Sequence, residues 1–215
     1  MLKNRKLLFA NLTLAISILT THSYAMESSV NSLYFAAESG WSSMASGHVP
    51  PYQFTYKKSF GYRASMGYLF LIPARFSIGP EISYGYYGLI SYKNPSDLAV
   101  HYESTGWSLL ANLKHATTNY INLYLKAGIT DVFQHYDISG PGASITRGGF
   151  YQQKLCPTII AAGSYDMTQH TAVSLSYTHI FGNSSPLTNN SQLTFTDINQ
   201  IASVNSVMLG IIYLI

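Results

Sequence analysis

The chain has 215 residues, of which only 10% are charged, whereas 18 are Tyr, 10 are Phe and 16 are Gly. A soluble domain usually carries about 25% charged residues, so this composition argues against an ordinary water-exposed surface. The single cysteine, Cys156, excludes an intramolecular disulfide and a metal site built on several cysteines.

Residues 1–25 have the pattern of a cleaved secretory signal peptide. Three cations open the segment, an apolar run over residues 7–19 follows, and small residues stand at Ser23 and Ala25. This spacing predicts cleavage before Met26. An uncleaved anchor is the alternative, but the apolar run is short and interrupted by polar residues, so it spans a bilayer poorly.

Cleavage would also change the charge. Lys3, Arg5 and Lys6 account for three of the 12 Lys and Arg, so nine cations would remain against nine Asp and Glu. The mature chain is therefore expected to be neutral. It lacks the clustered basic surface that nucleic-acid binding requires, so we expect no nucleic-acid partner.

Apolar residues alternate with small or polar residues in eight segments of the remaining chain. These are residues 32–43, 60–72, 74–92, 100–116, 120–138, 151–167, 171–182 and 201–215. A tilted transmembrane strand needs roughly 9 to 11 residues, and no apolar run long enough for a transmembrane helix follows Met26. The pattern predicts an all-β protein, in which residues 26–215 form an eight-stranded antiparallel up-and-down transmembrane β-barrel.

The connections between these segments alternate between long and short. The long ones are residues 44–59, 93–99, 139–150 and 183–200, and the short ones are at Pro73, 117–119 and 168–170. Bacterial barrels have short periplasmic turns and longer external loops. We therefore expect four long external loops, three short periplasmic turns and both termini in the periplasm.

The two faces of each segment differ in a way that predicts which one meets lipid. In the third segment one face carries large apolar residues from Phe76 to Tyr86, and the other carries mainly Ser and Gly. Small residues suit the interior of an eight-stranded barrel, which is only wide enough for side chains. Aromatic residues near both ends of the apolar rows are typical of membrane girdles. They are Phe70, Phe76 and Tyr213 toward the turns, and Trp41, Tyr62, Tyr84, Tyr86, Trp107, Phe133 and Phe181 toward the loops.

The inward rows carry charges of both signs at comparable heights, namely Glu38, Arg63, Glu81 and Lys126. A lone buried charge is costly, so we expect Glu38 and Glu81 to pair with Arg63 and Lys126 in a network that plugs a polar lumen. A proton or ion path is the alternative. The same alternation places Arg75 and Lys114 lower in the lumen, and Lys154 near its outer mouth.

The last segment resembles the C-terminal signal read by the barrel-assembly machinery of outer membranes. Its alternate residues are Val207, Leu209, Ile211, Tyr213 and Ile215, although Ile215 stands where Phe is typical. With the signal peptide, eight segments and loop alternation, the mature chain resembles the superfamily of the OmpA membrane domain, OmpX and the opacity proteins. The resemblance implies a monomeric barrel in a Gram-negative outer membrane, in contact with its lipid and lipopolysaccharide. It implies no particular activity.

Small outer-membrane barrels include lipid-modifying enzymes, so the histidines are candidates for catalytic or metal-binding residues. The closest match is the segment 177–183, but Phe181 occupies the place where a lipid A deacylase has its serine, two residues after His179. The other histidines have no short paired spacing, although two or more could still converge at the loops. We therefore predict no catalytic residues, no metal and no cofactor.

Two external loops are candidate contact surfaces. The first combines aromatic rings and cations, as an adhesive loop does, and its candidate contacts are Tyr52, Phe54, Tyr56, Lys57 and Lys58. Aromatic residues also arise there if strands merely continue past the bilayer. The fourth loop holds Leu193, Phe195 and Ile198, so residues 191–198 could extend the sheet and recruit a partner by strand addition.

Pro80 and Pro157 fall inside predicted strands, where each removes a hydrogen-bond donor from the ladder. Bulges at both positions are expected, and a bulge at Pro157 would reverse the facing of the residues after it.

Taken together, the sequence predicts a non-catalytic barrel that presents surface loops for adhesion, interaction or envelope stability. A narrow porin-like channel is the second reading, and a lipid-modifying enzyme the third.

Overall fold

The computed structural model describes residues 31–45, 53–56, 58–93, 99–139, 150–183 and 201–215. Its strands are β1 (Ser32–Met44), β2 (Gln53–Tyr56), β3 (Lys58–Ile72), β4 (Phe76–Lys93), β5 (Ala99–Ala116), β6 (Ile121–Ser139), β7 (Phe150–Asp166), β8 (Thr171–Ile180) and β9 (Val204–Leu214). No helix in this described part of the chain is long and apolar enough to cross a membrane. The predicted signal peptide lies outside the described residues.

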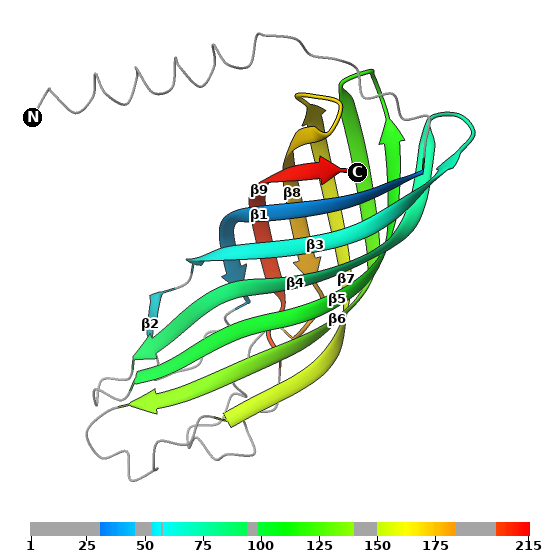
Figure 1. Ribbon diagram of the computed structural model, residues 1–215. Coiled ribbons are helices and arrows are strands. Elements are labelled where there is room, and N and C mark those ends of the chain that lie inside the picture. Colours follow the sequence, from blue (N-terminus) through cyan, green and yellow to red (C-terminus); the bar gives the residue numbers. More distant parts are fainter. Residues whose placement is uncertain (1–30, 46–52, 57, 94–98, 140–149, 184–200) are drawn as a thin grey trace, which may run out of the picture.

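Eight of the strands close into one antiparallel barrel (Figure 1). β1 pairs with β3 on one side and with β9 on the other, and β4 pairs with β5 to complete the ring. Followed around the barrel, the cross-strand partners of Tyr34 lead back to β1 at Met44, so the strands are tilted against the barrel axis. The predicted eight-stranded antiparallel barrel is confirmed.

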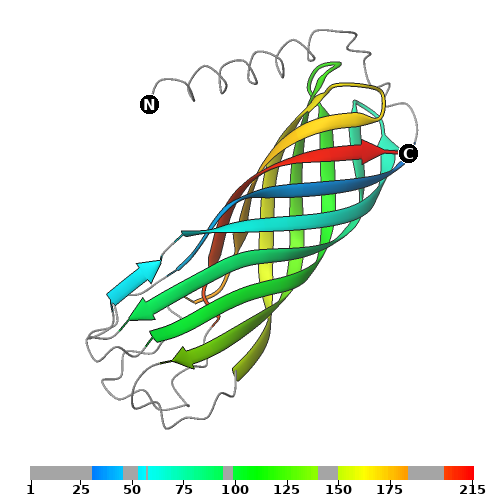
Figure 2. The ribbon, with the colours of Figure 1, turned by 60° about the vertical axis from the view of Figure 1, so that its left-hand side comes forward.

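The strands differ in length, and the wall of the barrel is correspondingly uneven. β4 to β7 have 17 to 19 residues each, whereas β8 has 10 and β9 has 11. We call the end with residues 73–75, 117–120 and 167–170 the turn end, and the opposite end, with Met44, Lys93, Ser139 and Ile180, the loop end. At the loop end β4 to β7 project beyond the shorter strands (Figures 1 and 2).

The short strand β2 lies in the first predicted loop and adds to the projecting sheet. Gln53 pairs with Lys93 and Phe54 with Tyr92, both on β4. The sequence placed these residues in a loop, because four residues are too few for alternation to distinguish a strand. Tyr52, Lys57 and residues 191–198 lie outside the described residues.

The structure contradicts the bulges expected at the two prolines. The β3–β4 ladder is interrupted beside Pro80, but the register is the same before and after the gap. The β6–β7 register runs through Pro157 without a shift. The backbone N–H of Phe181 donates to the Pro157 carbonyl at 2.9 Å, in the last β7–β8 contact. Because the missing donor of Pro157 falls where this ladder ends, the strand needs no bulge.

A bulge that the sequence did not reveal lies on β4. Tyr86 pairs with Thr105 and Gly88 with Ser104, which leaves Tyr87 as an additional residue. Gly88 has φ +93°, a backbone conformation that glycine adopts without strain. Beyond the bulge the facing of β4 is reversed, because Ser91 now shares the outward row with His101.

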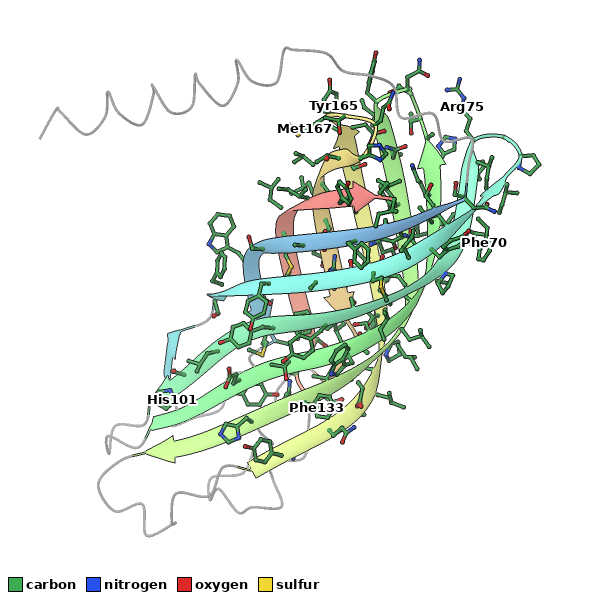
Figure 3. The ribbon with its side chains drawn as sticks, in the orientation of Figure 1. Phe70, Arg75, His101, Phe133, Tyr165 and Met167 are labelled. Atoms are coloured by element: carbon green, nitrogen blue, oxygen red, sulfur yellow. The ribbon has the colours of Figure 1, made fainter. Side chains whose placement is uncertain are left out.

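The first turn corrects the placement of Arg75. Ala74 and Arg75 have φ values of 68° and 65°, a left-handed conformation that non-glycine residues rarely adopt. This turn occupies residues 73–75 rather than Pro73 alone, and the Arg75 side chain is exposed at the turn end instead of lying in the lumen (Figure 3).

Candidate functional site

The interior of the barrel is the candidate site that the charges of the sequence indicate. Alternation along the strands turns one row of each strand inward, and six charged side chains are buried there. They are Glu38, Arg63, Glu81, Lys114, Lys126 and Asp166. Among the described outward-facing side chains of the barrel strands, only Glu103 and Asp131 are charged, and both lie toward the loop end. The charges are therefore concentrated inside the barrel.

Arg63 of β3 connects three strands across the lumen. Its Nε donates to Glu38 Oε2 at 2.7 Å, and its Nη2 donates to the same oxygen. On the far side, Nη1 donates to Thr178 Oγ1 at 2.7 Å, and Nη2 donates to Ser176 Oγ at 3.3 Å. Arg63 is only 2% exposed, so these partners replace the water that a guanidinium would otherwise bind.

Glu81 of β4 is the centre of a second cluster. Lys126 Nζ lies 2.5 Å from Glu81 Oε2, and the Tyr34 hydroxyl donates to the same carboxylate oxygen. Asn112 Nδ2 donates to the Tyr34 hydroxyl at 2.7 Å. The ammonium group of Lys126 also lies 5.9 Å from the ring centroid of Tyr34 and 6.0 Å from that of Tyr124. The structure thus brings Glu38 together with Arg63, and Glu81 together with Lys126.

Nearer the turn end, the lumen holds a polar group that sequence reasoning missed. The side-chain amide of Asn122 donates to both carboxylate oxygens of Asp166 at 2.9 Å. Lys114, which alternation did place inside, is buried at 3% exposure. Asp166 is the last residue of β7, and its even-numbered position is the sequence signal that indicates an inward side chain.

Toward the loop end the interior holds buried apolar side chains among polar ones such as Ser104, Thr130 and Gln134, which the prediction of a polar lumen did not include. The side chains of Val132, Ile160, Ile180, Val204 and Met208 are almost completely buried. Ile201 and Ala202, which precede β9, are buried as well. The backbone N–H of Ala202 donates to the Tyr102 hydroxyl of β5 at 3.3 Å. This segment also bonds to Asn183 and Ala45 beside it on the barrel wall, so it is the Tyr102 side chain that extends across the lumen toward it.

Lys154 was expected near the outer mouth and is instead exposed. Its even-numbered position on β7 belongs to the inward row, but the residue lies beyond Thr158, where the pairing with β8 ends. With no neighbouring β8 residue at this height, the side chain reaches solvent. Parity along a strand indicates a buried side chain only where both neighbouring strands continue.

The outer wall is apolar between two zones of aromatic residues. Trp41, Tyr62, Trp107 and Phe181 are exposed toward the loop end, and Phe70 and Tyr213 toward the turn end. Figure 3 labels Phe70 and Tyr165 near one end of the barrel and Phe133 toward the other. Some of these rings meet across strands, such as Tyr62 with Tyr86, whose ring centroids are 5.2 Å apart, and Tyr84 with Trp107 at 4.9 Å.

A groove of about 390 Å³ opens on this wall near the loop end, and we call it the Trp41 groove. Its outward-facing lining residues are Trp41 and Ser43 of β1, Asn205 and Val207 of β9, and Tyr177 of β8. Val207 forms the floor between the two rings, because its cross-strand partners are Trp41 and Tyr177.

His179 lies beside the Trp41 groove. Its Nδ1 is 2.7 Å from Asn205 Oδ1, and its ring packs edge-on against Phe181 with centroids 4.3 Å apart. No group of three or more His, Cys, Asp or Glu residues that could hold a metal ion occurs among the described residues.

The loop residues singled out from sequence are only partly described. Phe54 and Tyr56 belong to β2, and Lys58 is the first residue of β3. The backbone therefore holds three of the five candidate contacts at the loop end of the sheet.

Comparison with known proteins identifies the fold and no family. No protein-family model matches the chain, and no curated protein matches it. A major outer membrane protein from Thermus thermophilus is similar in structure, with a TM-score of 0.55 and 12% identity over 86% of this chain and 100% of that one. The outer membrane protein OprG from Pseudomonas aeruginosa has a TM-score of 0.51 and 10% identity over 85% and 95%. The chain has the fold of outer-membrane β-barrels.

Proposed function

We propose that residues 26–215 form a non-catalytic barrel of a Gram-negative outer membrane, exported by the signal peptide of residues 1–25. In this proposal the barrel is a monomer, its lumen is closed by its own side chains, and its loop end faces outward. The projecting strands and loops there contact a surface, a host ligand or another envelope component.

Membrane insertion is supported by the chemistry of the outer wall. Leu109, Leu125, Leu175 and Leu209 are each about half exposed or more, and a soluble protein rarely exposes so continuous an apolar surface. The aromatic zones at both ends have the positions that Tyr and Trp take at the two membrane interfaces.

The observation that best supports a closed lumen is that buried side chains fill it at two heights. The Glu38–Arg63 and Glu81–Lys126 pairs cross its middle, and a second layer of buried side chains, including Tyr102, Ile180 and Ile201, occupies the lumen nearer the loop end. A narrow channel is the second candidate, supported only by the charged character of the middle layer. It would require both layers to rearrange.

Two measurements on the purified protein test this proposal. The folded barrel should migrate differently on SDS gels before and after boiling, because a transmembrane barrel resists SDS until heated. In planar bilayers the same preparation should leave the baseline current unchanged. Recovery of the protein in the soluble periplasmic fraction would contradict membrane insertion, and steady single-channel steps would favour the channel.

The contact surface is supported by the uneven wall. β4 to β7 extend past the rim formed by β8 and β9, and β2 adds a strand beside β4. Tyr52, Phe54, Tyr56, Lys57 and Lys58 lie in or next to β2 and remain the candidate contacts in this proposal. Loops positioned by a rigid scaffold are frequent binding surfaces.

A further inference from the structure

The Trp41 groove lies where the apolar wall of the barrel meets its polar rim. On the side of the groove toward the turn end, the apolar wall continues with Leu209 of β9 and Leu175 of β8, which are 60% and 57% exposed. At the level of the groove, Trp41 is 72% exposed and faces Tyr177 across Val207. One row further toward the loop end stand Ser43, Asn205 and His179, which are cross-strand neighbours. From the middle of the wall toward the loop end, the surface is therefore first apolar, then lined by two aromatic rings and then by hydrogen-bonding groups.

The hydrogen bonds of Asn205 leave a donor available at the groove. The Tyr177 hydroxyl donates to Asn205 Oδ1 at 2.7 Å, and His179 Nδ1 lies 2.7 Å from the same oxygen, so Nδ1 is the donor there. The Asn205 amide nitrogen has two N–H groups and no hydrogen-bond partner among the described residues. The His179 ring adds a second hydrogen-bonding group beside this amide.

The described lining of the groove contains no charged side chain, and Lys58 is the β3 partner of the lining residue Ser43. Phosphate binding in proteins relies on Arg, Lys or several backbone N–H groups, and neither Lys nor Arg is among the described residues that line the groove. An uncharged sugar fits better, because the apolar face of a sugar ring packs against aromatic rings while its hydroxyls bond to amide and imidazole groups. Its acyl chains would continue along Leu209 and Leu175.

From these observations we infer that the Trp41 groove binds one membrane lipid through an uncharged sugar headgroup. This inference rests on the proposed function, since it needs the wall to lie in a membrane. The sugar packs between Trp41 and Tyr177 and accepts a hydrogen bond from the Asn205 amide. The barrel thereby holds one lipid in a defined place on the β8–β9–β1 side.

The test is lipid binding by the full-length folded protein in micelles of a sugar-free detergent, lauryldimethylamine oxide, followed by native mass spectrometry. The titrants are the neutral glycolipid diglucosyl diacylglycerol and phosphatidylglycerol with the same acyl chains. We expect one saturable adduct with the glycolipid, and at least about tenfold weaker binding of phosphatidylglycerol. Equal binding of both lipids would overturn sugar recognition.

Two variants and one control locate the site. Asn205→Asp keeps the oxygen that Tyr177 and His179 use but removes the amide donor, and Trp41→Leu removes one ring. Each should weaken glycolipid binding by about tenfold, since 1.4 kcal/mol corresponds to that factor. The only other tryptophan, Trp107, lies on β5, away from the groove, so Trp107→Leu should leave binding unchanged.

The gel shift on heating separates the two possible failures. A protein that shifts on heating but shows no saturable adduct, or that responds equally to Trp41→Leu and Trp107→Leu, would overturn the glycolipid site alone. A protein that shows no heat-dependent shift would contradict the barrel in a membrane on which the site depends.

Discussion

At the scale of single residues, the interior of this barrel depends on charges that are buried in pairs. Glu81 is 1% exposed and accepts from both Lys126 and Tyr34. Removing one partner of a buried pair leaves the other charge without compensation, which usually costs about 3 to 5 kcal/mol. Replacing both partners by neutral groups of similar shape is often much milder.

We therefore predict that Lys126→Met lowers the free energy of unfolding by about 3 kcal/mol or more. The double variant Lys126→Met with Glu81→Gln should recover most of the loss, because Gln retains an oxygen for the Tyr34 hydroxyl and carries no charge. Urea unfolding in lipid vesicles, followed by the heat-dependent gel shift, measures the effect. Lys154→Met, at an exposed lysine, is the control and should change stability by less than about 0.5 kcal/mol. A Lys126→Met variant as stable as this control would show that the pair contributes nothing.

The same residues illustrate what a sequence conveys about a site. Alternation is a local property, so it places Glu38, Arg63, Glu81 and Lys126 on inward rows without knowledge of the fold. Thr178 and Ser176, which hold the far side of Arg63, come from a strand 113 or more positions away. Small hydroxyl residues are common on every inward row, so no sequence signal singles these two out.

At the scale of the strand, the bulge on β4 decides which side chains of the projecting sheet face outward. Gly88 has a positive φ, and a Cβ atom there would lie in close contact with the Ser59 side chain. Gly163 on β7 differs in both respects, since an added Cβ would have its nearest neighbour, Leu123 Cδ2, at 3.8 Å.

We predict that Gly88→Ala destabilises the barrel by more than about 1 kcal/mol, because alanine is strained at this φ and contacts Ser59. Gly163→Ala, the matched control, should be neutral or should stabilise by up to about 1 kcal/mol, since alanine reduces the freedom of the unfolded chain. The midpoint of urea unfolding compares the two. Equal midpoints would mean that the bulge does not need glycine.

The element boundaries were predicted to within a few residues, whereas the irregularities were not. Bulges were expected at Pro80 and Pro157 because proline removes a hydrogen-bond donor. Both positions are nevertheless accommodated without a register shift. The ladder ends beside one proline and is interrupted beside the other. At Pro157 the missing donor needs no bulge because the pairing with the neighbouring strand stops there, and that is a property of the partner strand.

At the scale of the whole molecule, the direction in which the barrel crosses the membrane remains a prediction. Gln153 is exposed at the loop end, on the projecting part of β7, and Asn119 is exposed in the turn between β5 and β6. The native Cys156 is buried, so a thiol reagent should react only with an introduced cysteine.

We predict that a membrane-impermeant maleimide labels Gln153→Cys on intact cells, and that it labels Asn119→Cys only after the outer membrane is opened. The unmodified chain should remain unlabelled in both conditions, because burial keeps the reagent from Cys156. The reverse pattern would place the turn end outside and would refute the proposed orientation. It would leave the barrel fold untouched.

The sequence by itself determined the class of fold, the number of membrane-length strands and, away from the β4 bulge and the strand ends, which rows of side chains turn inward. All three follow from a period of two along the chain and from the scarcity of charge, and both are local or compositional properties. Only the tertiary structure decided which inward side chains meet, because register and closure bring together residues that are far apart in sequence. It also showed the apolar side chains buried near the loop end, among them Ile201 and Ala202, and the Trp41 groove, which needs three adjacent strands in register. Alternation carries no information on register between strands, which is why these features could not be seen beforehand.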